Sequence, residues 1–180
     1  MSSHGSTLDV GSATSLKPDG PIRTLIRTYG LFRRVMDPYF ATFGISGSQW
    51  AVLRALSRAE GDSSEGLRVT DIGERLLIRT PSVTGVVDRL QRMGLLTRVP
   101  APDDHRARHV RLTDPGRERV ARVLQHLPAQ VESVLSVLTA AEQAELWRLL
   151  TKLGNHLEHG VDGSFDPHVH DDIEPETDHA

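Results

Sequence analysis

Arginine side chains are concentrated in the middle of this sequence of 180 residues. Between Arg68 and Arg122 there are twelve arginines and only seven acidic residues. A guanidinium group pairs with phosphate oxygens, so a locally basic segment is the electrostatic footprint expected of a phosphate-binding surface. A solvated helical surface would carry the same excess of charge, and charge alone does not separate the two interpretations.

The most specific arrangement of side chains begins at Thr80-Pro81. A capping hydroxyl followed by proline in the first turn is a strong helix start, and Gly94 is a good C-terminal stop. One face of this helix is apolar and is made of Val83, Val86, Val87 and Leu90. The other face therefore shows small polar residues and arginines, which can approach base edges and hold phosphates.

A β-hairpin is predicted directly after this helix. Leu96–Pro100 and Arg108–Thr113 lie on either side of the polar turn 101–107, and the second stretch alternates apolar and polar residues. An arginine at the tip of such a hairpin, here Arg106, suits the narrow, electronegative minor groove of DNA. The side chains that we expect at nucleic acid, from this hairpin and the helices before it, are Thr70, Thr80, Ser82, Thr84, Arg89, Arg92, Asp104, Arg106 and Arg108.

Two helices are predicted before this segment at the N-terminal side. The first begins at Pro21 and should kink or end at Asp37-Pro38, because proline has no amide donor for the preceding turn. The second is capped by Ser46 or Ser48 and runs out by Gly61. Both carry apolar residues at helical spacing.

Three further helices are predicted from cap residues and periodicity. Thr70 is expected to cap a short helix. A long helix follows from about Asp114 and should bend at Pro128. Thr139 and Glu142 have the spacing of a capping box, which opens a last helix that reaches Leu157.

The order of these elements predicts a mainly α fold with a small β-hairpin wing, in which a winged helix-turn-helix is flanked by other helices. The segments Thr80–Leu96, Pro102–Thr113 and Gly116-Arg117 also resemble the MarR (multiple antibiotic resistance regulator) family. The most specific parts are the Asp-x-Arg motif at Asp104–Arg106 and the Leu-Thr-x-x-Gly turn at Leu112–Gly116. The similarity covers roughly residues 21–157.

The resemblance implies a DNA-binding lobe at about residues 47–113 and dimerisation helices at about 21–43 and 114–157. It further implies a homodimer on a palindromic operator of double-stranded DNA. Arg106 would enter the minor groove, braced by Asp104, while Ser82 and Thr84 lie at the major groove. Such proteins usually repress nearby genes, and small anionic or phenolic ligands often release them. The apolar stripes of the outer helices favour a dimer independently, since they exceed what the winged helix needs.

A ligand site is less sharply indicated. An arginine among aromatic side chains would suit a small aromatic or phenolic effector with a carboxylate. The residues that could line such a cleft are Tyr29, Arg33, Tyr39, Phe40 and Trp50. The alternative is that these aromatic side chains only pack the junction between the helices.

The two ends of the chain differ in composition from the middle. Residues 1–20 are expected to form a flexible N-terminal arm. Residues 158–180 form an acidic, His-containing tail that we expect to be disordered, and no Lys or Arg follows Lys152. His156 and His159, with His168, His170, Asp171 and Asp172, allow a metal-responsive regulator as an alternative function, although a solvated tail is the simpler interpretation and no metal ligand is assigned.

Several function classes are disfavoured by what the sequence lacks. It has no cysteine, no apolar run long enough for a membrane span and no secretory signal at Met1–Gly20, so a cytoplasmic protein without a membrane partner is expected. No catalytic motif is present, so we expect neither an enzyme nor a cofactor. An interaction module that does not bind DNA is the remaining alternative.

Overall fold

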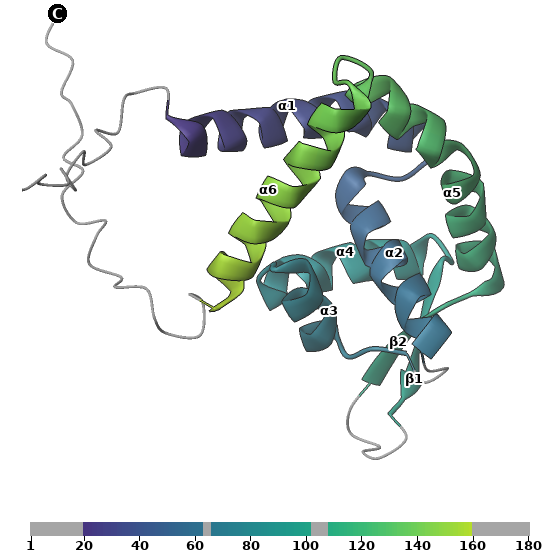
Figure 1. The fold of residues 1–180 in the computed structure, drawn as a ribbon. Helices are drawn as coiled ribbons and strands as arrows, with labels where there is room; N and C mark the ends of the chain where they lie inside the picture. Colours follow the sequence, from purple (N-terminus) through teal and green to yellow (C-terminus); the bar gives the residue numbers. More distant parts are fainter. Residues whose placement is uncertain (1–19, 63–65, 102–107, 160–180) are drawn as a thin grey trace, which may run out of the picture. The chain divides into compact units, whose positions relative to one another are not determined.

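The computed structural model describes residues 20–62, 66–101 and 108–159, and it shows helices with one two-stranded sheet (Figure 1). The elements are α1 (Pro21–Ala41), α2 (Gly47–Asp62), α3 (Val69–Leu76), α4 (Thr80–Arg92), β1 (Leu96–Pro100), β2 (Arg108–Leu112), α5 (Asp114–Leu135) and α6 (Ala140–His159). The predicted fold class, mainly α with a β-hairpin wing, is confirmed.

The chain divides into two compact units that meet inside α5, between Leu127 and Pro128. The first unit holds α1 to α4, the hairpin and the first part of α5. The second holds the rest of α5 and α6. The expected arm at residues 1–19 and the tail from residue 160 lie outside the described residues.

The core of the first unit is centred on α2, which contacts α1, α3, α4 and β2. Large apolar side chains from α2, α3, α4 and β2 are fully buried, among them Leu53, Ile72, Leu90 and Val110. Burying one such side chain stabilises a fold by roughly 1.5–3 kcal/mol. The packing therefore fixes α3, α4 and the hairpin on one scaffold.

The hairpin is antiparallel, with Leu96 opposite Leu112 and Pro100 opposite Arg108. Val110 and Leu112 are buried, as their alternation in the sequence predicted. Leu67 adds an isolated bridge beside β2, through hydrogen bonds in both directions with the backbone of Val110 at 3.1 and 2.8 Å. No sequence pattern predicted this bridge, since a single residue carries no periodicity.

The prediction that Thr70 caps α3 is wrong. Arg68 is the N-cap, and its amide donates to Oδ2 of Asp71 across 3.1 Å. Thr70 lies within the helix, where its hydroxyl is 3.3 Å from Oδ1 of Asp71. The helix start is held instead by the Asp71 carboxylate, which accepts from the amide of the N-cap residue, and a charged acceptor makes this hydrogen bond stronger.

Thr80 is likewise not a cap. It is the first residue of α4, Arg79 is the N-cap, and no side chain caps this helix start. Pro81 nevertheless lies in the first turn, where its missing amide costs nothing. Gly94, with φ of 73°, follows the C-cap Met93, so the predicted stop is confirmed.

Helix α1 does not end at Pro38 but continues to Ala41. Met36 and Phe40, on either side of the proline, are both buried, and their packing holds the last turn in place. The next helix, α2, is opened by Ser46, whose amide donates to Oε1 of Gln49 at 2.8 Å while its hydroxyl accepts from the Gln49 amide. This confirms Ser46 rather than Ser48 as the cap, and α2 ends at Asp62, one residue beyond the expected Gly61.

In the second unit, the predicted capping box at the start of α6 is confirmed. The Thr139 amide donates to Oε2 of Glu142 at 2.8 Å, and the Glu142 amide donates to the Thr139 hydroxyl at 3.3 Å. The helix extends to His159, so the first two residues of the predicted tail are helical. Among the described helices, none is long and apolar enough to cross a membrane.

Candidate nucleic-acid interface

Helix α4 has the two faces that its sequence predicted. Its four apolar residues are buried against the core. On the other side Ser82, Arg89 and Arg92 are exposed, and Thr84 is half-buried. The Thr84 hydroxyl donates to the carbonyl oxygen of Thr80 at 3.0 Å, which leaves its oxygen lone pairs available as acceptors. An exposed helix face with hydroxyls near its start and guanidinium groups near its end is suited to a DNA groove.

A tight turn joins α3 to α4 and sets where α4 begins. The Ile78 amide donates to the carbonyl oxygen of Gly73 at 2.9 Å. A Cβ atom at position 73 would lie only 2.9 Å from the Ile78 carbonyl oxygen, so glycine is required there. Leu77 occupies the left-handed region with φ of 52°, although its side chain is 84% exposed. The turn therefore depends on one close backbone contact and one strained residue.

The hairpin is tied to α4 by charged side chains. Nη2 of Arg98 on β1 donates to Oδ1 of Asp88 on α4 across 2.6 Å, and Nη1 of Arg98 donates to Gln91. Asp88 therefore belongs to a structural link rather than to the free surface of α4. Because the two elements are held together, a ligand bound by α4 would meet the hairpin in a fixed register.

The base of the hairpin is tied to the helix that follows it. Thr113 donates from Oγ1 to the Gly94 carbonyl oxygen at 2.7 Å, and its Oγ1 accepts from the Gly116 amide at 3.2 Å. Gly116 is buried, and a Cβ there would lie 2.2 Å from the Leu95 carbonyl oxygen. The Leu-Thr-x-x-Gly turn is thus the joint between the end of α4 and the start of α5.

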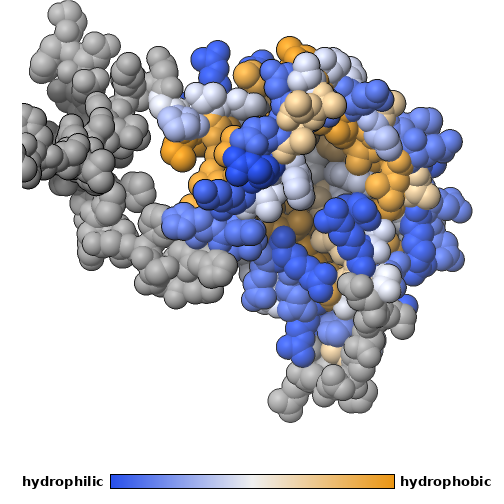
Figure 2. Space-filling view, in the orientation of Figure 1, coloured by the Kyte–Doolittle hydropathy of each residue, from blue (hydrophilic) through white to orange (hydrophobic). Residues whose placement is uncertain are grey.

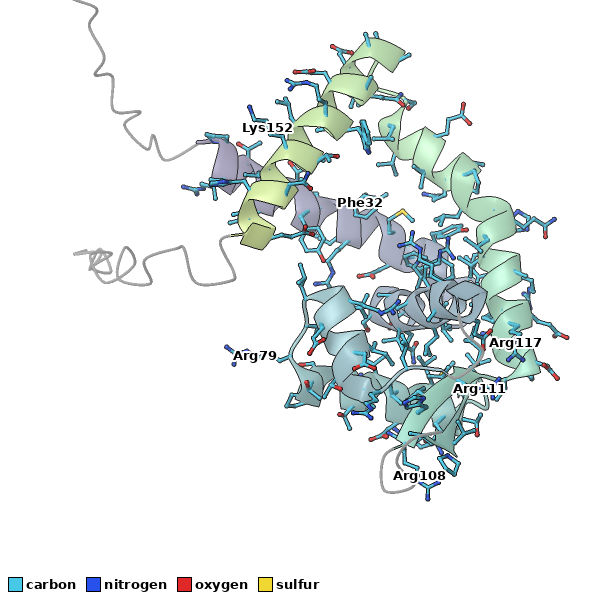
Figure 3. The ribbon with its side chains drawn as sticks, turned by 60° about the horizontal axis from the view of Figure 1, so that its bottom comes forward. Phe32, Arg79, Arg108, Arg111, Arg117 and Lys152 are labelled. Atoms are coloured by element: carbon cyan, nitrogen blue, oxygen red, sulfur yellow. The ribbon has the colours of Figure 1, made fainter. Side chains whose placement is uncertain are left out.

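Cationic side chains extend from this part of the molecule. Figure 3 shows Arg79, just before α4, and Arg108, the first residue of β2, pointing away from the protein. Among the residues that the structure describes, neither has an ion-pair partner, and Arg89 also has none. Arg79 is not among the DNA-binding residues predicted from the sequence, because the helix cap is predicted at the threonine that follows. Its place just before a proline-containing helix start was the available signal.

The other predicted nucleic-acid residues have different placements. Thr70 and Thr80 are exposed at the first turns of α3 and α4. Arg92 is exposed in the last turn of α4, and its Nε donates to the Asp88 carbonyl oxygen at 3.4 Å. Asp104 and Arg106 lie outside the described residues, which resume at Arg108.

The five predicted ligand-site residues do not form one cluster. Phe40 and Trp50 are buried and stacked, with ring centroids 5.8 Å apart. Tyr39 packs edge-on against Phe40, and its hydroxyl donates to the Val123 carbonyl oxygen at 3.0 Å. Burial raises the pKa of Tyr39. Tyr29 and Arg33 are exposed on α1. Phe40 and Tyr39 thus pack within the protein, and the ligand site that includes them stays a prediction.

No group of three His, Asp or Glu side chains is placed to hold a metal ion among the described residues. His168, His170, Asp171 and Asp172 lie outside the described residues. His156 lies on α6 and has an interaction within the protein.

Comparison with known proteins agrees with this geometry. The model of the MarR family matches residues 43–107. The HTH-type transcriptional regulator PecS of Dickeya dadantii is 29% identical over 136 residues, which are 76% of this chain and 81% of PecS.

Two solved structures are similar over most of the chain. MarR from E. coli, in complex with operator DNA, is 26% identical with a TM-score of 0.66, over 74% of this chain and 93% of that one. BpsR of Bordetella bronchiseptica, whose DNA binding is regulated by 6-hydroxynicotinic acid, is 26% identical with a TM-score of 0.67, over 76% of this chain and 94% of that one.

Proposed function

Because this chain belongs to the MarR family of DNA-binding transcriptional regulators, we propose that it binds a palindromic operator as a homodimer and represses nearby genes. It is a regulator and not an enzyme. The family match favours neither a metal-responsive tail nor a module that does not bind DNA.

The exposed face of α4 is the observation that carries the proposal. Ser82 and Thr84 lie in its first turns and would face base edges in the major groove, while Arg89 and Arg92 near its end would hold phosphates. Thr70, at the first turn of α3, would add a phosphate contact. The link between Asp88 and Arg98 holds the hairpin beside this face.

The hairpin would act as the wing in the adjacent minor groove. Arg108 is exposed at the start of β2 and would contact the DNA backbone there. The resemblance assigns Arg106 to the minor groove and Asp104 to bracing it. An arginine in a narrow minor groove gains from the enhanced negative potential between the strands.

Two exposed apolar surfaces, one on α1 in the first unit and one on α6 in the second, support a homodimer. Helix α1 exposes a set of large apolar side chains: Ile22, Leu25, Ile26, Tyr29, Leu31, Phe32 and Val35. Hydrophobic surface is visible next to the start of this helix in Figure 2. Helix α6 exposes a second set: Leu146, Trp147, Leu149, Leu150 and Leu157. A second copy would bury both, because a monomer rarely leaves so many large apolar residues in water. We therefore propose that residues 21–43 and 114–157 dimerise and residues 47–113 bind DNA.

Release by a small organic acid completes the proposal. The similar protein BpsR is regulated by 6-hydroxynicotinic acid, an aromatic carboxylate. An arginine-rich protein offers such a ligand charge-assisted hydrogen bonds. We propose an aromatic or phenolic acid as the effector that lowers the affinity of this chain for its operator.

A gel-shift experiment with the DNA upstream of the protein's own gene tests DNA binding. Arg106→Ala should weaken binding by about tenfold or more, because loss of one groove contact costs about 1–3 kcal/mol. Arg122→Ala is the matched control, since Arg122 is an exposed arginine on α5 outside the proposed interface. Equal binding by the two variants would count against the role of the hairpin as a wing. If the wild-type protein shifts no DNA that contains an inverted repeat, the proposed function is rejected.

A further inference from the structure

A cavity of about 440 Å³ opens on the first unit between α2 and the end of α3. Trp50, Arg54 and Arg58 line it from α2, and Arg75 and Leu76 line it from α3. The three α2 residues are spaced four apart, so they form one stripe along the helix. The volume lies within the range of about 300–1,000 Å³ that is typical of small-molecule sites.

The charged lining of the cavity is entirely cationic. Three guanidinium groups face it, and no acidic side chain lines it. Within the described residues, Arg54, Arg58 and Arg75 make no ion pair and no side-chain hydrogen bond, whereas Arg98, Arg117 and Arg148 do. Three unpaired cations around one hollow repel each other, and an anion bound between them would relieve that repulsion.

An aromatic wall lies beside these cations. Trp50 is only 9% exposed and is held by its stacking on Phe40. The part of the indole that reaches the cavity is therefore rigid. The apolar side chain of Leu76 lines the cavity as well. A flat ring could lie against these groups while its acidic substituent meets the guanidinium groups, which is the usual combination of a mainly apolar wall with a few polar anchors.

We propose that this cavity binds the effector, as a small aromatic carboxylate held by Arg54, Arg58 and Arg75 against Trp50. The inference rests on the proposed function, since it names the site at which that regulator is controlled. Of the five ligand-site residues predicted from the sequence, only Trp50 lines this cavity. The cationic side chains of the cavity are Arg54, Arg58 and Arg75, and not the predicted Arg33.

The cavity is coupled to α4 by the chain itself. Arg75 and Leu76 are the last two residues of α3, and the strained Leu77 follows directly. The turn then closes through the Ile78 amide on Gly73, and α4 begins at Thr80. An anion that draws Arg75 toward α2 would move the end of α3 and with it the start of α4. Because the two binding equilibria are linked, bound acid would lower the affinity for DNA, and bound DNA would lower the affinity for the acid by the same factor.

Tryptophan fluorescence can test binding without DNA. The chain has two tryptophans, so a Trp147→Phe background leaves Trp50 as the single reporter. We expect benzoate to quench it, while benzyl alcohol, which has the ring without the charge, and inorganic phosphate, which has the charge without the ring, bind at least about tenfold more weakly. Equal binding of phosphate would show a simple anion site, and no quenching by benzoate would overturn the proposal.

Two arginine variants assign the contact in the same background. Arg54→Gln and Arg58→Gln should each weaken benzoate about tenfold, because each removes a charge-assisted hydrogen bond. Arg122→Gln, which removes an equal charge away from the cavity, should leave benzoate binding unchanged. Equal benzoate affinity in all three variants and the parent would overturn the assignment.

A gel shift with and without benzoate separates this inference from the proposed function. We expect the Arg58→Gln protein to bind operator like the wild type but to be released by benzoate only at about tenfold higher concentration. Operator release that is identical in Arg58→Gln and wild type would reject the cavity while leaving DNA binding intact. Benzoate quenching in a protein that shifts no DNA would instead reject the proposed function and leave the cavity as a binding site.

Discussion

Arg98, on the first strand of the hairpin, donates from Nη2 to Oδ1 of Asp88 on α4 across 2.6 Å. The two side chains are 30% and 49% exposed, so water screens much of the attraction. A double-mutant cycle with Asp88→Asn and Arg98→Gln should give a coupling of about 0.5 kcal/mol in the free energy of unfolding. Both single variants should also bind operator more weakly, because the wing is no longer held beside α4.

The cycle distinguishes this link from two independent surface charges. Additive effects of the two substitutions on the unfolding free energy would show that the ion pair contributes nothing to stability. Unchanged operator affinity in both single variants would show that the hairpin keeps its place without Arg98.

Thr113 is expected to stabilise the joint between the hairpin and α5. Thr113→Ala removes the hydrogen bond to the Gly94 carbonyl oxygen and the cap on the Gly116 amide, which should cost about 1–2 kcal/mol. Thr113→Ser keeps the hydroxyl and should unfold close to the wild type in urea. A serine variant as unstable as the alanine variant would mean that the methyl group, and not the hydroxyl, carries the effect.

Gly116 should tolerate no larger residue. A Cβ atom there would lie 2.2 Å from the Leu95 carbonyl oxygen, and backbone cannot move aside as a side chain can. Gly116→Ala should therefore destabilise the protein by about 2 kcal/mol or more. Gly154→Ala is the control, since its Cβ would meet nothing within 4 Å and the change should gain about 0.5 kcal/mol in a helix. Thermal melting of both variants checks the contrast.

Glu142 makes the start of α6 sensitive to acid. Hydrogen bonds from the Thr139 amide and hydroxyl hold the pKa of Glu142 below its usual range. A lowered pKa means that the contribution to stability is present above the unfolded value and is lost as the pH falls through the folded value. Helicity followed by circular dichroism should therefore fall more steeply below pH 4.5 in the wild type than in Glu142→Gln. Parallel pH curves of the two proteins would show that the Glu142 carboxylate does not stabilise the start of α6.

Arg89 should contribute to the affinity for DNA but not to its sequence specificity. It is exposed on α4 and has no ion-pair partner among the described residues. Arg89→Ala should weaken binding to all duplexes by a similar factor and reduce the slope of log K against log salt by about one. Arg122→Ala should leave that slope unchanged. A loss confined to the operator sequence would instead make Arg89 a base-reading residue.

Helix periodicity and hairpin alternation were readable because burial imposes them on many residues at once. Val83, Val86 and Val87 had to share a face once α4 was recognised, and Val110 and Leu112 had to share a face of the strand. The capping box at Thr139 was readable because both partners lie within three residues. Local signals of this kind need no tertiary information.

The predictions of helix ends were wrong where two local signals competed, or where packing in the core determined the end of the helix. Helix α3 begins at Val69, one residue before the predicted cap Thr70, and its start is held by the hydrogen bond from the Arg68 amide to the Asp71 carboxylate. At Pro38 the buried Met36 and Phe40 outweighed the lost hydrogen bond. The cavity over Arg54 and Arg75 joins separate helices, so no spacing within one element could predict it.

The turn between α3 and α4 gives two nearby positions unequal mutational tolerance. Leu77 has its backbone in a left-handed conformation and its side chain in water, so glycine or asparagine could replace it with relief of strain and little loss of packing. Gly73 has no such latitude, because the Ile78 carbonyl oxygen occupies the space of any side chain. Among related regulators, diversity should therefore accumulate at position 77 while position 73 stays fixed.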